Sequence, residues 1–316
     1  MDDVRVPVYL ITGFLESGKT TFLSFTLDQD YFRIDGKTLL ILCEEGEEEY
    51  DTKALAKRNT VVEIIEKEED LTTERLEAME IIHQPERVVM EYNGMWLVSK
   101  LEQMKLPQGW GIEQHITCAD ASTFQVYMTN MKSIFMDMVR NADMVVFNRC
   151  RQGDPLANFR RSIKVNNQRA EVIFEDEEGE IEDIFGDELP FDLEAPVVEI
   201  MPEDYGIWFV DAMDHPETYV GKTVRFKGRI LKPRGMGSRF FVPGRTAMTC
   251  CADDTTFLGY VCKSENAPSL KEGQWAEITA KVAFERRMEY QGEGVVLYAQ
   301  SAEPCAPLEE EMVYFN

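Results

Sequence analysis

The sequence lacks the segments that would place it in or across a membrane. Its 316 residues contain no run of 18 apolar residues and no basic segment followed by an apolar one at the start, so neither a membrane-spanning helix nor a signal peptide is expected. Seven cysteines, an odd number spread over a long chain, fit a reducing compartment better than a disulfide framework. We therefore expect a cytoplasmic protein that does not insert into membranes.

Positive charge is also scarce. The chain carries 33 Lys and Arg against 58 Asp and Glu, a net charge of −25, and residues 1–200 hold −21 of it. A field of this sign repels nucleic acid and anionic lipid. Nucleic acid is therefore not the favoured partner of the protein.

Two kinds of local pattern divide the chain. Apolar strand-like runs alternate with helical stretches over residues 1–195, which predicts an α/β domain with a mostly parallel sheet covered on both faces. After a linker at 196–204, residues 205–316 predict a helix near Asp204–Met213 and then short strands, typical of a small closed or partly open β-barrel, OB-like in size. The expected strands lie at 6–12, 38–43, 87–91, 114–119 and 144–148, then within 223–233, 239–244, 257–263, 275–285 and 294–303.

The stretch GFLESGKTT follows the first expected strand and opens a helix. It fits G-x-x-x-x-G-K-[ST], a loop whose backbone N–H groups surround nucleotide phosphates. Lys19 would reach the β and γ phosphates, and the Thr20 hydroxyl would bind Mg²⁺. The carboxylate of Glu16 would cost about 0.4 kcal/mol at about 10 Å from a phosphate in water, which the loop can outweigh. The predicted nucleotide-binding residues of the loop are Gly13, Glu16, Ser17, Gly18, Lys19, Thr20 and Thr21.

The first about 195 residues resemble the CobW-like P-loop GTPases, a family linked to metal delivery. Its loop GFLGxGKTT is followed by a switch segment NEFGEVGID, to which CEEGEEEYD at 43–51 is similar. The family's IETTG-like strand end looks like MEYNG at 90–94. The resemblance implies GTP or a related nucleotide with Mg²⁺, Asp51 and Glu91 beside the metal, Glu91 as a catalytic residue with Lys19, and Gly94 near the γ-phosphate. The sequence shows no obvious arginine finger, so hydrolysis without a partner is expected to be slow.

Two departures from the family pattern stand out. Where the family reads guanine with NKxD, this chain has Asn148, Arg149, Cys150 and Arg151, and an arginine offers donors only. Asn148 and Arg149 would still hold the base, but the choice of guanine stays open. The family's CxCC metal motif is also missing from the equivalent stretch, 63–76.

Residues from about 205 to 316 resemble the C-terminal domain of YcgQ-type permease subunits, chiefly through FVPGRTAMTCCADD at 241–254. This implies a permease or a metal-receiving protein as partner. Cys250 and Cys251 are adjacent, and Cys262 follows on a later strand. The three thiolates could hold Zn²⁺ or another transition metal, although one buried and one exposed thiol, or a vicinal disulfide, are alternatives.

A basic stretch at 221–245 leaves three readings open: single-stranded nucleic acid, a solvated strand face, or docking on an acidic surface. Two functions therefore remain in competition. One is a nucleotide-dependent GTPase-type metallochaperone or regulator in metal homeostasis or transport. The other is a scaffold for a permease system with a degenerate nucleotide site.

Overall fold

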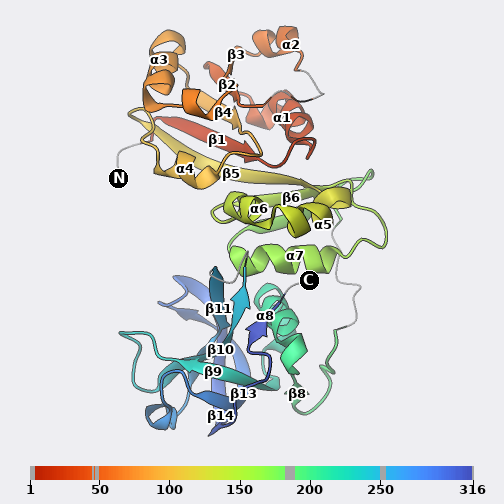
Figure 1. Cartoon of the computed structure of the whole chain (residues 1–316), viewed down its shortest axis with the longest axis vertical. Coiled ribbons are helices and arrows are strands. Elements are labelled where there is room, and N and C mark those ends of the chain that lie inside the picture. Colours follow the sequence, from red (N-terminus) through yellow and green to blue (C-terminus); the bar gives the residue numbers. More distant parts are fainter. Residues whose placement is uncertain (1–3, 45, 47–49, 182–188, 250–253, 315–316) are drawn as a thin grey trace. The chain divides into compact units, whose positions relative to one another are not determined.

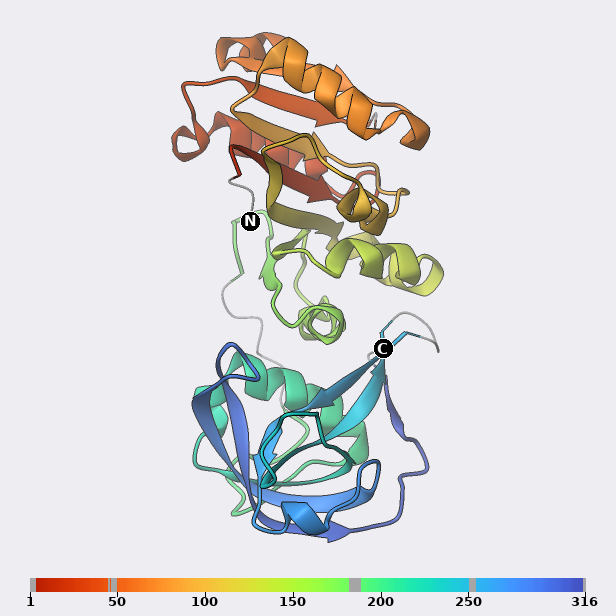
Figure 2. The ribbon, with the colours of Figure 1, turned by 90° about the vertical axis from the view of Figure 1, so that its left-hand side faces the viewer.

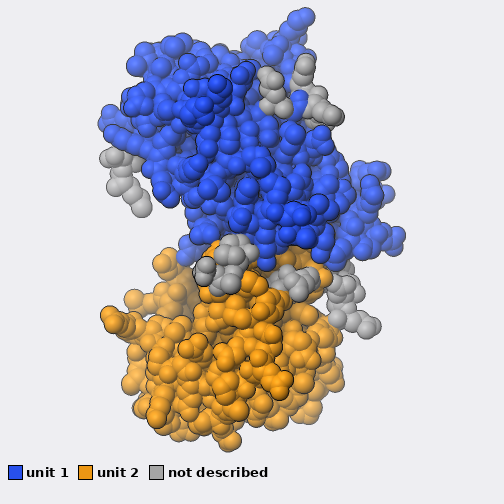
Figure 3. Space-filling view, viewed as in Figure 1, with its two compact units in different colours: residues 1–156, 166–183 blue, residues 157–165, 184–316 orange. Residues whose placement is uncertain are grey.

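The computed structural model describes residues 4–44, 46, 50–181, 189–249 and 254–314. The chain divides into two compact units (Figure 3). Unit 1 comprises residues 1–156 and 166–183, and unit 2 comprises residues 157–165 and 184–316. Within the described residues, no helix is both long and apolar enough to cross a bilayer.

Unit 1 is built on a seven-stranded sheet in the order β3-β2-β4-β1-β5-β6-β7, and every pairing in it is parallel. The right-handed crossover rule places α1 and α2 on one face and α3 to α6 on the other, and Figure 2 shows α1 and α3 on opposite faces. The predicted α/β domain is confirmed. The elements are β1 (Val6–Thr12), α1 (Lys19–Asp28), η1 (Asp30–Phe32), β2 (Thr38–Leu42), α2 (Thr52–Lys57), β3 (Thr60–Ile64), η2 (Glu68–Asp70), α3 (Thr73–His83), β4 (Arg87–Glu91), α4 (Val98–Gln103), β5 (Trp110–Asp120), α5 (Ala121–Asn130), α6 (Lys132–Val139), β6 (Met144–Asn148), α7 (Leu156–Asn166) and β7 (Glu171–Phe174).

The two strands that the sequence pattern misses, β3 and β7, lie at the two edges of this sheet. An edge strand has one neighbour and is covered incompletely, so its sequence need not be a continuous apolar run. The residues of β3 are mostly half-buried, and β7 has exposed Glu171 at its start. The five predicted strands are the ones with two sheet neighbours.

Unit 2 contains a small closed barrel of five strands. The pairings run β9 to β10, β12, β14, β13 and back to β9, and all are antiparallel except β12 with β14. The predicted barrel is therefore confirmed, as is the helix before it. The elements of this unit are β8 (Val198–Glu199), η3 (Pro202–Asp204), α8 (Tyr205–Asp214), α9 (Pro216–Tyr219), β9 (Thr223–Leu231), β10 (Phe240–Met248), β11 (Thr255–Gly259), β12 (Val261–Lys263), η4 (Ala267–Ser269), β13 (Trp275–Arg287), β14 (Gly292–Pro304) and β15 (Met312–Val313).

An aromatic cluster closes the barrel core. Trp208 of α8 is fully buried, and its ring lies 4.9 Å from that of Phe226 in β9 and 5.6 Å from that of Tyr260. Aromatic pairs at such distances add stabilisation beyond the area they bury. Helix α8 thus packs against the barrel strands, as Figure 1 shows.

Two sequence expectations differ from the structure of unit 2. The stretch 257–263, expected as one strand, divides at buried Tyr260 into β11 and β12. The expected linker at 196–204 contains β8, which pairs in parallel with β9. The paired residues are 26 positions apart, and pairing over such a separation leaves no trace in local hydrophobic spacing.

Candidate functional site

The predicted phosphate loop connects β1 to α1, in the strand–loop–helix order that the G-x-x-x-x-G-K-[ST] motif requires. Gly13 and Gly18 both have left-handed backbones, with φ of 138° and 91°. A Cβ at Gly13 would lie 2.3 Å from the carbonyl oxygen of Cys118, so only glycine fits there. Glu16 also has a positive φ, 63°. The structure thus explains why a glycine would be the unstrained residue at position 16.

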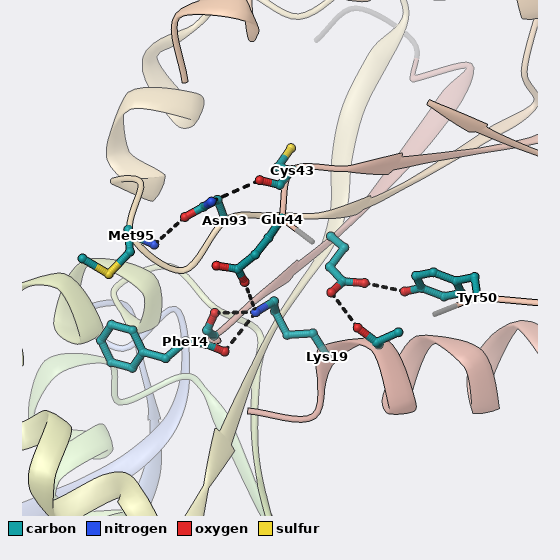
Figure 4. A network of polar contacts seen from close by, with 10 residues as sticks. Phe14, Lys19, Cys43, Glu44, Tyr50, Asn93 and Met95 are labelled. Atoms are coloured by element: carbon teal, nitrogen blue, oxygen red, sulfur yellow. Dashed lines mark hydrogen bonds and ion pairs between the residues drawn. The ribbon is translucent and has the colours of Figure 1, made fainter. Parts of the chain in front are cut away.

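Lys19 begins α1 and is only 3% exposed. Its ammonium nitrogen donates to the carbonyl oxygens of Gly13 and Phe14, each at 2.9 Å, and forms an ion pair of 2.7 Å with Glu44 (Figure 4). The main-chain contacts fold the side chain back over the loop, where the motif requires it. Glu44, the second residue of the switch-like segment at 43–51, is thus in contact with the loop through Lys19.

Thr20 and Glu91 meet beside Lys19. The Thr20 hydroxyl donates to one oxygen of Glu91 at 2.9 Å, and the Tyr50 hydroxyl donates to the other. Burial raises the pKa of Glu91 above its usual range, although these two hydrogen bonds and Lys19 oppose that shift. The sequence predicts Thr20 and Glu91 together, and the structure brings them into contact.

Gly94, which lies three residues after the end of β4, packs against the backbone of the loop. A Cβ at Gly94 would lie 2.5 Å from the carbonyl oxygen of Gly13 and 2.7 Å from Cα of Phe14. The neighbouring Asn93 donates to the carbonyl oxygen of Cys43 at 3.1 Å. Gly94 therefore touches the phosphate loop itself, and its predicted contact with a phosphate stays a prediction.

Asn148, the last residue of β6, and Arg149, the residue after it, also reach the loop. The Asn148 amide donates to the carbonyl oxygen of Ser17 at 2.8 Å, and Arg149 donates to the carbonyl oxygen of Glu16 at 2.8 Å and to Asp120 at 2.6 Å. Burial raises the pKa of Asp120, but hydrogen bonds from Ser122 and Arg149 outweigh it and hold the pKa below its usual range. Arg149 is thus fixed on the loop.

A cavity of about 270 Å³ unites these groups. Its lining combines cations, carboxylates and hydroxyls, an arrangement suited to a charged and hydroxyl-rich ligand. Two buried polar atoms of residues outside this lining, Ser17 Oγ and Asn148 Oδ1, have no hydrogen-bond partner among the described residues. The cavity is lined by Leu15, Glu16, Gly18, Lys19, Thr20, Thr21, Glu44, Gly46, Glu91 and Arg149.

The N-terminal half of the chain matches the model of a known protein family. Residues 7–174 match the model described as the CobW/HypB/UreG nucleotide-binding domain. The chain belongs to the CobW/HypB/UreG family. Residues 186–315 match a second model, the DUF1980 C-terminal domain. No curated protein matches the chain.

Several solved structures are similar to this chain at low sequence identity. The Zn(II)-bound YjiA GTPase from E. coli is 17% identical, with 82% of this chain and 89% of that one covered and a TM-score of 0.43. The hydrogenase maturation factor HypB from Archaeoglobus fulgidus is 17% identical, with 54% and 81% covered and a TM-score of 0.41. HypB from Helicobacter pylori, in complex with nickel, is 13% identical, with 54% and 78% covered and a TM-score of 0.33.

Five of the predicted site residues of unit 1 lie outside the cavity lining, namely Gly13, Ser17, Asp51, Gly94 and Asn148. Asp51 caps the N-terminus of α2 through its side chain, which accepts from the backbone N–H groups of Lys53 and Ala54. Its role beside Mg²⁺ stays a prediction. Arg151, the residue that leaves the choice of guanine open, is exposed, and its backbone N–H donates to Asp154 at 2.7 Å.

The predicted thiolate site lies in unit 2. Cys250 and Cys251 fall outside the described residues, and Cys262 is fully buried in β12, where burial raises the pKa of its thiol to about 12. Thiolates, and not thiols, bind metal. Among the described residues no three His, Cys, Asp or Glu side chains gather as a metal site.

Tyr50 and Asp120 are residues near the site to which the sequence alone assigns no role, although both lie in segments that resemble the family pattern. Tyr50 follows a run of acidic residues, and only the folded chain brings its hydroxyl to Glu91. Asp120 ends β5 at the sheet edge where β1 and β6 also end. Residues at the carboxyl ends of adjacent parallel strands share one edge, and that rule could have placed Asp120 next to Arg149.

Proposed function

We propose that unit 1 binds a nucleoside triphosphate, GTP or a related one, together with Mg²⁺, and works as a nucleotide-dependent switch. The single observation that carries this proposal is the convergence of Lys19 with the Thr20–Glu91 pair in one cavity. The family match to a nucleotide-binding domain supports it. The cavity supplies a cation for phosphate and oxygen atoms for a hard metal ion.

The residues present fit both groups. Ser17 Oγ and Asn148 Oδ1 are buried polar atoms without a partner among the described residues, and such atoms are commonly satisfied by a ligand or by water. Thr20 and Glu91 offer the oxygen atoms that Mg²⁺ prefers. When bound, the metal ion would neutralise phosphate charge. In the chain itself, Lys19 would bind the phosphates, Thr20 and Glu91 would hold the ion, and Asn148 and Arg149 would support the base.

Hydrolysis by this site should be slow. The cations among the described residues of the cavity lining are Lys19 and Arg149, and Arg149 is already engaged by Asp120 and the carbonyl oxygen of Glu16. Fast P-loop hydrolysis needs a mobile arginine on the transferred phosphate, often supplied by a partner protein. We therefore propose a GTPase-type metallochaperone or regulator whose hydrolysis depends on a partner.

Nucleotide titration tests this proposal. Isothermal calorimetry with GTP and with ATP, each with and without Mg²⁺, should show binding that requires Mg²⁺. Lys19→Ala should abolish it, while Lys57→Ala, an exposed lysine of α2 outside the cavity, should leave it intact. A folded protein that binds neither nucleotide would refute the proposal.

The metal and transport part of the proposal concerns unit 2. The resemblance of 241–254 to YcgQ-type permease subunits and the adjacent Cys250 and Cys251 support a Zn²⁺-type cargo and a permease or metal-receiving partner. Elemental analysis of the purified protein checks the metal directly. A stoichiometric metal in the wild type that disappears in Cys250→Ser would support it, and equal metal content in both would argue against it.

A scaffold without hydrolysis is the second candidate. Arg151 favours it, because an arginine at this position cannot accept the hydrogen bonds that the guanine edge donates. Partner capture decides between the two. If Lys19→Ala leaves partner binding and metal content unchanged, the nucleotide site has no part in either and the scaffold is the better description.

A further inference from the structure

The ammonium group of Lys19 has all three of its protons in use. Two go to the carbonyl oxygens of Gly13 and Phe14 and the third goes to Glu44 at 2.7 Å. A lysine ammonium has only three protons to donate. A phosphate that binds Lys19 must therefore displace one of these three acceptors.

Glu44 is the acceptor that a phosphate would displace. Gly13 and Phe14 belong to the loop backbone, which is fixed between β1 and α1 and braced by Gly94. Glu44 is instead a side chain beyond the end of β2, and it shares the cavity lining with Lys19. Its carboxylate and a phosphate carry the same sign of charge, so both cannot remain against one ammonium without repulsion.

We propose that Glu44 is an internal competitor of the nucleotide: its carboxylate holds the position on Lys19 that the β or γ phosphate takes. The ion pair is shielded from water, since the Lys19 and Glu44 side chains are only 3% and 11% exposed. Charge-assisted hydrogen bonds in such surroundings are stronger than neutral ones. A ligand therefore binds Lys19 only if it can displace the carboxylate of Glu44.

The neighbouring carboxylates are held differently, which singles out Glu44. Both oxygens of Glu91 accept hydroxyl protons, one from Thr20 and one from Tyr50. Glu16 contributes its backbone carbonyl to Arg149. Glu44 is the carboxylate whose contact with Lys19 is a direct ion pair.

Ligand discrimination follows from this arrangement. A polyphosphate with Mg²⁺ brings several contacts and can compete with Glu44, whereas a single phosphate brings few. This consequence rests on the proposed nucleotide function. The competition itself concerns only Lys19, Glu44 and a polyphosphate chain, so it can be measured without a base.

The test compares the wild type with Glu44→Gln, which removes the charge and keeps the shape. Affinity is measured by calorimetry for Mg²⁺–GTP and for tripolyphosphate, the latter as a probe without a base. Glu44→Gln should bind both about 10-fold more tightly, because a charge-assisted hydrogen bond no longer has to be broken. Glu44→Asp, which keeps the charge, should stay close to the wild type.

Glu66→Gln is the charge control, since it removes one negative charge from an exposed position of the same unit outside the cavity lining. An equal gain from Glu66→Gln would mean that general charge, and not the pair with Lys19, sets the affinity. Unchanged or weaker binding by folded Glu44→Gln overturns the inference, and weaker binding would make Glu44 part of the bound state. If tripolyphosphate responds as expected while no protein binds GTP, the inference holds and the proposed function fails.

Discussion

The Asn148 side-chain amide donates a hydrogen bond to the carbonyl oxygen of Ser17 at 2.8 Å. This bond connects the end of β6, where the sequence predicts base-binding residues, to the predicted phosphate loop 131 residues earlier. A Cβ at Gly18 would lie 2.4 Å from the Asn148 nitrogen. The predicted base-binding and phosphate-binding segments are therefore one packed unit.

Arg151→Asp should restore a preference for guanine. An aspartate at this position can accept from the guanine N1–H and N2–H₂ groups, which adenine does not offer. Hydrogen bonds to a charged group are worth about 1.5–3 kcal/mol each, so GTP should gain about 10-fold or more over ATP. Competitive titration of the two nucleotides measures the ratio.

Arg151→Ala is the comparison for this substitution. It removes the arginine without adding an acceptor, so the ratio of the two affinities should stay near that of the wild type. If Arg151→Asp shifts neither affinity, position 151 does not face the base.

Gly94→Ala should weaken nucleotide binding. The added methyl would lie 2.5 Å from the carbonyl oxygen of Gly13 and 2.7 Å from Cα of Phe14, so the loop backbone would have to shift, which costs more than the movement of a flexible side chain. Because Lys19 donates to the carbonyl oxygens of Gly13 and Phe14, the shift would displace its ammonium group as well. We expect at least a 10-fold rise in the dissociation constant for GTP, a loss of about 1.4 kcal/mol. Full affinity in the variant would mean that the loop tolerates the shift.

His115 should make the stability of unit 1 depend on pH. The ring is buried in β5 and lies 3.0 Å from the hydroxyl of Thr12. Burial lowers its pKa to about 4, from an ordinary value of about 6.5. The unfolded chain therefore takes up a proton at a higher pH than the folded chain does.

The contribution of His115 is complete above pH 6.5 and is lost as the pH falls toward 4. Between pH 7.5 and pH 5 the loss in unfolding free energy should be about 2 kcal/mol. Denaturant unfolding at both pH values, for the wild type and for His115→Gln, isolates this part. A pH difference of the same size in His115→Gln would assign it to other groups.

Gly244→Ala should destabilise unit 2. Gly244 lies where β10 pairs with both β9 and β11, and an added Cβ would be 2.1 Å from the carbonyl oxygen of Leu258. Forced overpacking of this kind costs about 1–3 kcal/mol. Gly237→Ala is the matched control, because the nearest atom would be the Phe240 ring at 3.4 Å. Equal thermal midpoints for the two variants would show that the barrel can open at this junction.

The sequence predicted the parts of unit 1 that depend on local pattern. Strands with two neighbours are continuous apolar runs, and the G-x-x-x-x-G-K-[ST] motif is formed by residues close together in the chain. The central strands and the strand–loop–helix order around the motif were therefore predicted correctly. The ion pair of Lys19 with Glu44 and the Tyr50–Glu91 hydrogen bond join residues 25 and 41 positions apart. Such contacts depend on how the sheet orders its strands, and hydrophobic spacing carries no record of that order.

The short, closely spaced strands in residues 205–316 predicted a barrel, but the sequence could not show whether that barrel is closed. Closure depends on β9 pairing with β10 on one side and with β13 on the other.

The basic stretch at 221–245 has acidic side chains from other segments beside it in the folded chain. Lys227 faces Glu277 across the β9–β13 pairing, and Arg239 forms an ion pair with Glu265. Acidic neighbours that are distant in sequence offset much of the positive charge.

Unit 2 is discontinuous in the sequence, because it includes residues 157–165 of α7 as well as residues 184–316. Arg160 forms an ion pair of 2.7 Å with Asp214 at the end of α8, and Val165 is part of the buried core of the unit. A single cut at 183/184 would therefore not yield a self-sufficient C-terminal fragment. Unit 2 cannot be transferred to another protein as one continuous segment, because its residues 157–165 lie inside the sequence of the nucleotide-binding domain.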